Sequence, residues 1–152
     1  MSKDALKFFQ AYLKEMIEIG GPNFPKSIST ELGAKLAKIY KERGIYDLEN
    51  GLRLSYQAIN ANPKIERLNQ KTFQIVMKYP KRFCPIGGKF RDDIEHAEMI
   101  QNSICFPYTY GFLNELDSNF KYKGTIKECI LKNNRDICHY LLELEEKTDI
   151  HD

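Results

Sequence analysis

Four cysteines are the residues of this sequence best suited to chemistry: Cys84, Cys105, Cys129 and Cys138. The last two belong to β-rich runs at residues 126–131 and 137–144, separated by a polar stretch that contains Asn133-Asn134. Because Asn tolerates the left-handed backbone of a tight turn, we expect a hairpin with its tip at these two residues. That register places Cys129 opposite Cys138, where Cβ atoms of paired residues lie within ~5.5 Å. The two thiols are therefore predicted to be neighbours.

Histidines that could act as a base beside a catalytic cysteine are few. The same register pairs Ile126 with Leu141, Glu128 with His139, and Ile130 with Ile137. For Glu128 and His139, a cross-strand charge pair at the surface is the simpler interpretation. His96 lies in an acidic helical segment and is expected to face solvent, and Gly87-Gly88 lacks the other members of a phosphate-binding loop. No motif therefore supports an enzymatic activity.

Thiol chemistry leaves three alternatives open. Zinc takes four thiolates in a tetrahedron at ~2.3 Å, but here the cysteines are separated by 20, 23 and 8 residues, without the short spacing of a zinc knuckle. Free cysteines are also among the most buried residue types, so all four can be core residues. A disulfide between Cys129 and Cys138 is the third alternative.

Composition excludes several classes of protein. The net charge is +2, from 23 basic and 21 acidic residues, so nucleic acid is not an expected partner. No stretch approaches the ~20 apolar residues of a membrane span, and the start, MSKDALKFFQ, does not resemble a signal peptide. We therefore expect a cytoplasmic protein without a membrane partner, whose cysteines serve as thiols or metal ligands more readily than as disulfides.

Helices are predicted for the first third of the chain. Residues 4–19 place Leu6, Phe9, Leu13, Met16 and Ile17 at helical spacing, and Phe8 and Tyr12 widen this apolar face beyond one packing stripe. We expect this helix to pack in the core or at a dimer interface, and we predict a homodimer formed through it. After a linker at 22–26, Ser29 is expected to cap a second helix that extends to residue 43. Its inward stripe is expected to be Leu32, Leu36, Ile39 and Tyr40. Asp47 is expected to cap a third helix at 48–61.

The remaining chain alternates between strands and helices. Phe73, Ile75, Met77 and Tyr79 have the period of a half-buried strand, whose hairpin partner is predicted at 64–68. A loop without regular structure is expected at 80–88, then a helical pair at 92–103 and 108–116 around Pro107, and the closing hairpin. The fold class is therefore α+β, with N-terminal helices, an antiparallel sheet built from two hairpins, and a helical pair between them.

The residues from Cys105 onward resemble the 4-vinyl reductase domain family. The carrying features are Cys105-Phe106, Gly111-Phe112-Leu113 at the start of a helix, and the cysteine pair in the terminal hairpin. The likeness covers about residues 28–146. We therefore divide the chain into residues 1–27, an N-terminal helix and linker, and residues 28–152, the 4-vinyl-reductase-like domain.

The resemblance implies a small-molecule binding domain instead of an enzyme. Relatives sense aromatic compounds or, more distantly, bind lipids in vesicle-tethering complexes. For this chain it implies a hydrophobic or aromatic ligand between the 72–79 strand and the 105–116 helix, with candidate contacts Phe73, Ile75, Met77, Phe106, Tyr108 and Tyr110. The plain alternative is that these side chains simply form the packed core.

The resemblance also implies a structural zinc ion. In the aromatic sensors three cysteines and a glutamate hold the metal, and the cysteines correspond to Cys105, Cys129 and Cys138. The family's glutamate position is Ile126 here, so Cys84 or Glu128 is the expected fourth ligand. Two other function classes stay open: an assembly subunit like those of the tethering complexes, and a thiol-based redox sensor or enzyme.

Overall fold

Two hairpins lie side by side to form the antiparallel sheet, whose strand order is β1-β2-β6-β5. The computed structural model describes residues 3–58, 61–79, 82–84, 86–90, 92–133 and 135–147, apart from the side chains of residues 3, 5, 6 and 9. The first hairpin is β1 (Asn62–Asn69) and β2 (Thr72–Lys78), and the second is β5 (Phe120–Glu128) and β6 (Ile137–Glu146). The predicted α+β class is confirmed.

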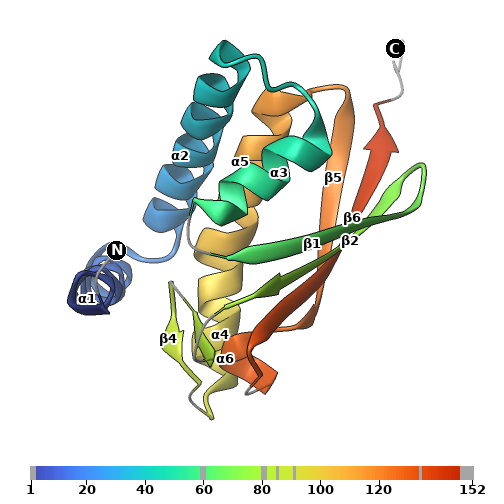
Figure 1. Ribbon diagram of the computed structural model, residues 1–152. Coiled ribbons are helices and arrows are strands. Elements are labelled where there is room, and N and C mark those ends of the chain that lie inside the picture. Colours follow the sequence, from blue (N-terminus) through green and yellow to red (C-terminus); the bar gives the residue numbers. More distant parts are fainter. Residues whose placement is uncertain are drawn as a thin grey trace.

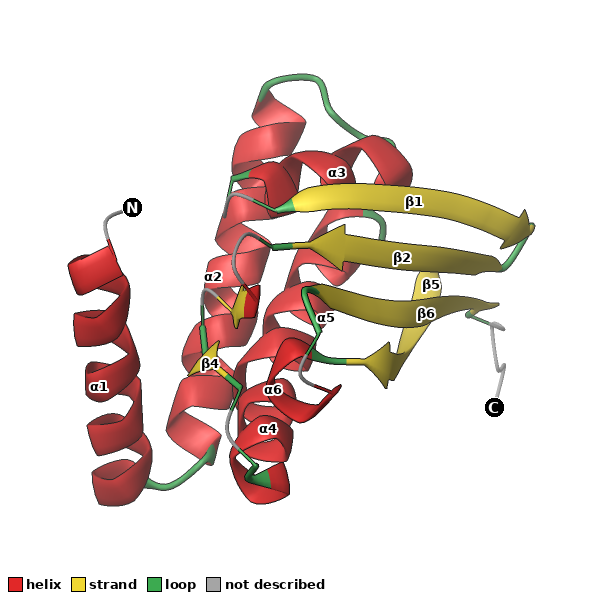
Figure 2. Ribbon diagram, turned by 60° about the horizontal axis from the view of Figure 1, so that its bottom comes forward, coloured by secondary structure: helices red, strands yellow, loops and turns green. Residues whose placement is uncertain are grey.

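Helices cover one face of this sheet (Figure 1). In chain order they are α1 (Lys3–Gly20), α2 (Asn23–Glu42), α3 (Leu48–Gln57), α4 (Ile94–Ile100), α5 (Phe106–Leu116) and the short α6 (Ile130–Asn133). Helices α2 and α5 pack against each other, and α1 lies at the edge of the domain beside α2 and β4 (Figure 2). Leu13 of α1 is buried as predicted, whereas the side chains of Leu6 and Phe9 are outside the described residues.

The start of α2 differs from the prediction. The helix begins at Asn23, with Pro22 at the N-cap and Pro25 in the first turn, where a proline needs no N–H partner. The predicted linker at 22–26 is therefore largely helix, and Ser29 is a buried interior residue instead of a cap. The predicted inward stripe is only partly correct, because Leu32 and Ile39 are 53% and 43% exposed.

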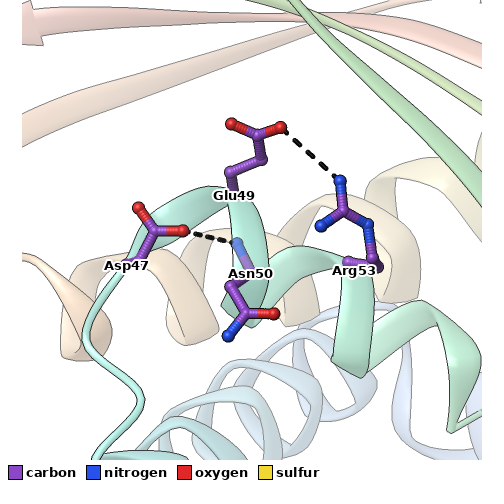
Figure 3. A network of polar contacts seen from close by, with 4 residues as sticks. All are labelled: Asp47, Glu49, Asn50 and Arg53. Carbon is purple, nitrogen blue, oxygen red and sulfur yellow. Dashed lines mark hydrogen bonds and ion pairs between the residues drawn. The ribbon is translucent and has the colours of Figure 1, made fainter.

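The cap of α3 is where the sequence places it. The Asp47 carboxylate accepts a hydrogen bond from the Asn50 backbone N–H at 2.9 Å (Figure 3). Glu49, in the first turn, forms an ion pair at 3.5 Å with Arg53, which lies one turn further along the helix. A carboxylate in this position satisfies a helix N–H that has no partner within the helix. The helix ends at Gln57, before the predicted end at residue 61.

Strand β2 carries the buried face predicted from its alternation. Phe73, Ile75, Met77 and Tyr79 are all buried. The loop predicted without regular structure instead contains the two-residue strands β3 (Phe83–Cys84) and β4 (Gly88–Lys89), which pair with each other. Its prolines, Pro80 and Pro85, lie outside the described residues.

The helical pair is a continuous rod with one irregular turn. A π-helical turn, Gln101–Cys105, joins α4 to α5, and Pro107 lies in the first turn of α5. Because Pro107 has no N–H, it cannot complete a helical hydrogen bond, and it lies where the π turn passes into α5, at the predicted junction of the two helices. Helix α4 begins after Asp93, whose carboxylate caps it by accepting a hydrogen bond from the His96 N–H at 3.1 Å. Such turns are frequent at functional sites.

The terminal hairpin forms in a different register from the prediction. Ile126 pairs with Tyr140 instead of Leu141, whereas Glu128 pairs with His139 as expected. Ile130 does not pair with Ile137, because residues 130–133 form α6. The Asn133 side chain accepts from the Cys129 N–H at 2.8 Å, so it caps this turn instead of forming a hairpin tip, and Asn134 is outside the described residues.

Candidate functional site

An apolar cavity of about 630 Å³ lies between the sheet and the helices. Its walls come from α1, α2, α3, β2, the π turn, α5, β5 and β6, and from the segment around β3. The apolar side chains of the wall include Leu13, Met16, Phe24, Ile28, Met77, Ile104, Phe106, Ile126 and Leu142. Glu128 is the one acidic residue on the described wall, and no Lys or Arg of the described residues lines it.

Two glycines fix how closely α2 approaches α5, which carries one wall of the cavity. A Cβ on Gly33 would lie 2.2 Å from the Tyr108 carbonyl oxygen, and a Cβ on Gly111 would lie 2.1 Å from the Thr30 carbonyl oxygen. Backbones therefore touch at both positions, where any side chain would force the helices apart. This contact sets the position of Tyr108 and its neighbours relative to α2.

The aromatic residues of α5 meet β5 at another glycine. The rings of Phe106 and Tyr110 stack with centroids 5.6 Å apart, and the Tyr110 hydroxyl accepts a hydrogen bond from the Gly124 N–H at 2.7 Å. A Cβ on Gly124 would lie 2.7 Å from the Phe106 ring. Gly124 thus lets this stacked pair lie directly on the strand at the cavity wall.

The predicted ligand residues divide into two groups. Met77, Phe106, Tyr108 and Tyr110 line the cavity. Phe73 and Ile75 are fully buried core residues that do not line it, which fits the alternative of plain packing for these two. Ligand contact by any of the six remains a prediction.

The contribution of the first two helices was missed from the sequence. Tyr12, Leu13 and Met16 of α1, and Phe24 and Leu32 of α2, line the cavity. The wide apolar face of the first helix is the signal, but its side chains were assigned to a core or dimer interface. A linear pattern shows that a face is apolar and does not show whether a packed side chain or an empty space lies opposite it.

All four cysteines are free thiols that line this cavity. Cys129 is not a strand residue in the structure, but it lines the same cavity as Cys138, and hydrogen bonding between the two thiols is the first cause of the shift in the pKa of each. This hydrogen bond lowers the pKa of Cys129 and raises the pKa of Cys138. Burial raises the pKa of Cys84 and of Cys105.

The described residues do not reproduce the expected zinc site. No group of three or more Cys, His, Asp or Glu side chains among them is arranged to hold a metal ion. Glu128, one expected fourth ligand, instead forms an ion pair with Arg135 at 2.6 Å. The four-cysteine site therefore remains a prediction, and we derive no step from it.

A few polar groups interrupt the apolar wall. The Nε2 atoms of Gln101 and His139 are buried and have no hydrogen-bond partner among the described residues. The hydroxyls of Tyr56 and Tyr140 are hydrogen-bonded to each other, and burial raises the pKa of both. A buried donor without a partner costs about 1–3 kcal/mol, so an acceptor on a bound molecule would be favourable here.

The fold of this chain is similar to that of a protein of known structure. A crystal structure of trafficking protein particle complex subunit 3 from Naegleria fowleri, covalently bound to palmitic acid, superposes with a TM-score of 0.62 and covers 93% of each chain at 11% identity. The two chains share a fold. No protein-family model matches this chain.

A curated sequence is also similar over part of the chain. A long-chain fatty acid transport protein from Salmonella typhi is 31% identical over 74 residues, which is 49% of this chain and 17% of that protein. The chain thus spans about a sixth of that relative's length. Within the described residues, no helix has the length and apolar character required to cross a membrane.

Proposed function

We propose that this protein binds a long-chain hydrophobic molecule, with a fatty acyl chain as the leading class, in the cavity between α5 and the sheet. The observation that carries the proposal is the cavity itself, about 630 Å³ with an almost wholly apolar wall. Small-molecule sites have volumes of about 300–1,000 Å³ and a few placed polar groups. Gln101 and His139 are polar groups of this wall whose Nε2 atoms have no hydrogen-bond partner among the described residues.

Both comparisons support an acyl ligand. The structural neighbour, whose fold extends over 93% of this chain, was solved with palmitic acid attached. The partial sequence relative is named for long-chain fatty acids. Neither protein determines the ligand of this chain, because identity with the first is 11% and the second matches over a small part of its length.

Native mass spectrometry of the purified protein tests the proposal. We expect an extra mass of one acyl ligand per chain, or uptake of one palmitate after delipidation. The same sample under denaturing conditions separates a bound ligand, which is lost, from a thioester on a cavity cysteine, which is retained. Delipidated protein that takes up no member of a fatty acid and aromatic panel, and gains no thermal stability from any, would refute the proposal.

A second proposal concerns assembly. Phe8, Tyr12, Ile19, Phe24 and Leu32 are between 53% and 84% exposed on α1 and α2, although all are large and apolar. Side chains of this size grouped on neighbouring helices favour a protein interface. We propose that α1 and α2 form the homodimer expected from the sequence, as an assembly subunit would require.

Two finer assignments are retained as proposals. The Cys105-Phe106 and Gly111-Phe112-Leu113 motifs support membership in the 4-vinyl reductase family. The presence of four thiols on the cavity wall favours a zinc site, whereas the described residues include no group of three metal ligands. Elemental analysis of reduced, chelator-free protein decides the second assignment, and well under one zinc per chain would remove it.

A further inference from the structure

A second hollow, of about 570 Å³, lies between α1, the β3–β4 hairpin and α4. We name it the basic groove, after its basic and amide side chains Lys7, Gln10, Lys14, Lys89 and His96. None of the described residues that line it is Asp or Glu. The acidic residues of α1, Asp4, Glu15 and Glu18, are exposed and are not part of its wall. The groove therefore concentrates positive charge in a chain of nearly balanced charge.

The lysines of the groove are available for a ligand. Within the part of the chain that the structure describes, the ion pairs use other cations, and Lys7, Lys14 and Lys89 take part in none of them. A lysine ammonium is a compact charge with three donors that binds phosphate and carboxylate groups. Like charges gathered in a concave site raise the local concentration of an anion.

Gln10 adds a donor inside the groove. Its Nε2 atom is buried and has no hydrogen-bond partner among the described residues. The amide lies over the hairpin backbone, since a Cβ on Gly88 would lie 3.0 Å from Gln10 Oε1, and Gly88 has a positive φ of 86°. A buried amide donor of this kind gains a hydrogen bond when an anionic oxygen enters the groove.

The basic groove and the apolar cavity share a wall. Leu13, Ile86 and Ile100 line both of them. The cavity has room for a hydrocarbon chain, but no described Lys or Arg lines it, and its one described acidic residue, Glu128, is already paired with Arg135. Burying an unpaired carboxylate or phosphate there is strongly unfavourable. The basic groove, which adjoins the cavity at these three residues, has the unpaired lysines that the described cavity wall lacks.

We propose that the basic groove binds the anionic group, a carboxylate or a phosphate, of an amphiphile whose hydrocarbon chain occupies the apolar cavity. This inference rests on the proposed function and adds the charge of the ligand to it. It assigns Lys7, Lys14 and Lys89 to charge recognition and Gln10 to a hydrogen bond with the same group. An acid is then preferred over an uncharged molecule with the same chain.

The test compares palmitate, hexadecyl phosphate and hexadecanol, each below its aggregation concentration, by calorimetric titration of delipidated protein at pH 8. We expect the two anions to bind at least about tenfold more tightly than the alcohol. The Lys7→Gln/Lys14→Gln/Lys89→Gln variant is expected to lose this preference while its affinity for hexadecanol is unchanged. Gln10→Met, which preserves the bulk and removes the amide, is expected to reduce the preference several-fold.

The control variant is Lys121→Gln/Lys123→Gln/Lys127→Gln, which removes the same charge from exposed positions of β5. It is expected to retain the preference for the anions. An equal loss in this control, or equal affinity of the wild type for palmitate and hexadecanol, overturns the groove assignment and leaves the cavity proposal standing. If none of the three ligands binds, both the groove assignment and the cavity proposal are overturned.

Inorganic phosphate distinguishes a lipid head group from a free anion. Because the head group and phosphate would compete for the same lysines, phosphate is expected to weaken palmitate binding without affecting hexadecanol. Phosphate that binds the wild type and leaves palmitate affinity unchanged would show a site for a soluble anion and overturn the lipid assignment.

Discussion

Gly33 of α2 lies against the backbone of Tyr108 in α5, so closely that a Cβ at position 33 would come within 2.2 Å of the Tyr108 carbonyl oxygen. We predict that Gly33→Ala destabilises the fold by about 3 kcal/mol or more, at the upper end of overpacking effects, because rigid backbone cannot move aside. The measurement is urea unfolding followed by circular dichroism.

The matched control for this substitution is Gly20→Ala. A Cβ on Gly20 meets its nearest neighbour, the Phe24 Cβ, at an ordinary 3.9 Å. We expect its stability to stay within about 1 kcal/mol of the wild type. If Gly33→Ala behaves like this control, α2 and α5 are not in backbone contact in solution.

The cavity predicts an asymmetry between two serines of α2. Ser29 is buried on the cavity wall, whereas Ser27 is exposed on the same helix and does not line it. Ser29→Phe is expected to fill part of the cavity and abolish the thermal shift by palmitate, which at a ligand concentration of 100 Kd corresponds to about 2.7 kcal/mol. Ser27→Phe is expected to retain that shift. An undiminished shift in Ser29→Phe would place the ligand elsewhere.

The exposed apolar residues of α1 predict a homodimer. Phe8 and Ile19 are 74% and 84% exposed, and a charge at each is expected to prevent association without affecting the core. Sedimentation of the wild type at tens of micromolar is expected to give a dimer, and Phe8→Glu/Ile19→Glu a monomer with unchanged circular dichroism. A wild type that is monomeric at that concentration contradicts the prediction.

Buried tyrosines predict a loss of stability in alkali. Burial raises the pKa values of Tyr56, Tyr79 and Tyr140 above their ordinary value of 10.0. The folded state therefore retains protons that the unfolded state releases, so this contribution is fully present below about pH 10 and is lost as the pH rises above it. Urea unfolding between pH 9 and 11 measures the slope.

A double variant that removes both hydroxyls of the hydrogen-bonded tyrosine pair tests the cause of this alkaline loss of stability. Tyr56→Phe/Tyr140→Phe leaves no buried hydroxyl of this pair without its partner, so we expect nearly unchanged stability at neutral pH. Above pH 10 the loss of stability is expected to be smaller than in the wild type. An identical alkaline slope in the two proteins would show that other groups control it.

Local patterns identified the strands but not all of their connections. Phe73 and Ile75 could be assigned to a buried face, because the side-chain period of a strand is independent of its partners. Asn133 suits both a hairpin tip and a helical cap, and its bond to the Cys129 N–H depends on how α6 packs. A turn residue with two good local conformations leaves that choice to tertiary contacts.

Some residues of the cavity wall were named from the sequence, and others were not. Met77, Phe106 and Tyr110 were named because of the family resemblance, whereas their strand and helix patterns alone favoured a packed core. Leu13 and Phe24 belong to helices whose packing partners are far away in sequence, so their apolar character carried no information about an empty space beside them. The basic groove was missed for the same reason, since Lys7 and Lys89 come together only when α1 lies beside the β3–β4 hairpin.

The position of β6 in the middle of the sheet governs when the protein can fold during its synthesis. Strand β6 pairs with both β2 and β5, so the two halves of the sheet are not joined until residues 137–146 have left the ribosome. Tyr140 and Leu142 of the same strand belong to the cavity wall. A nascent chain that ends before β6 therefore exposes the apolar faces of β2 and α5, and its ligand site is incomplete until β6 has been synthesised.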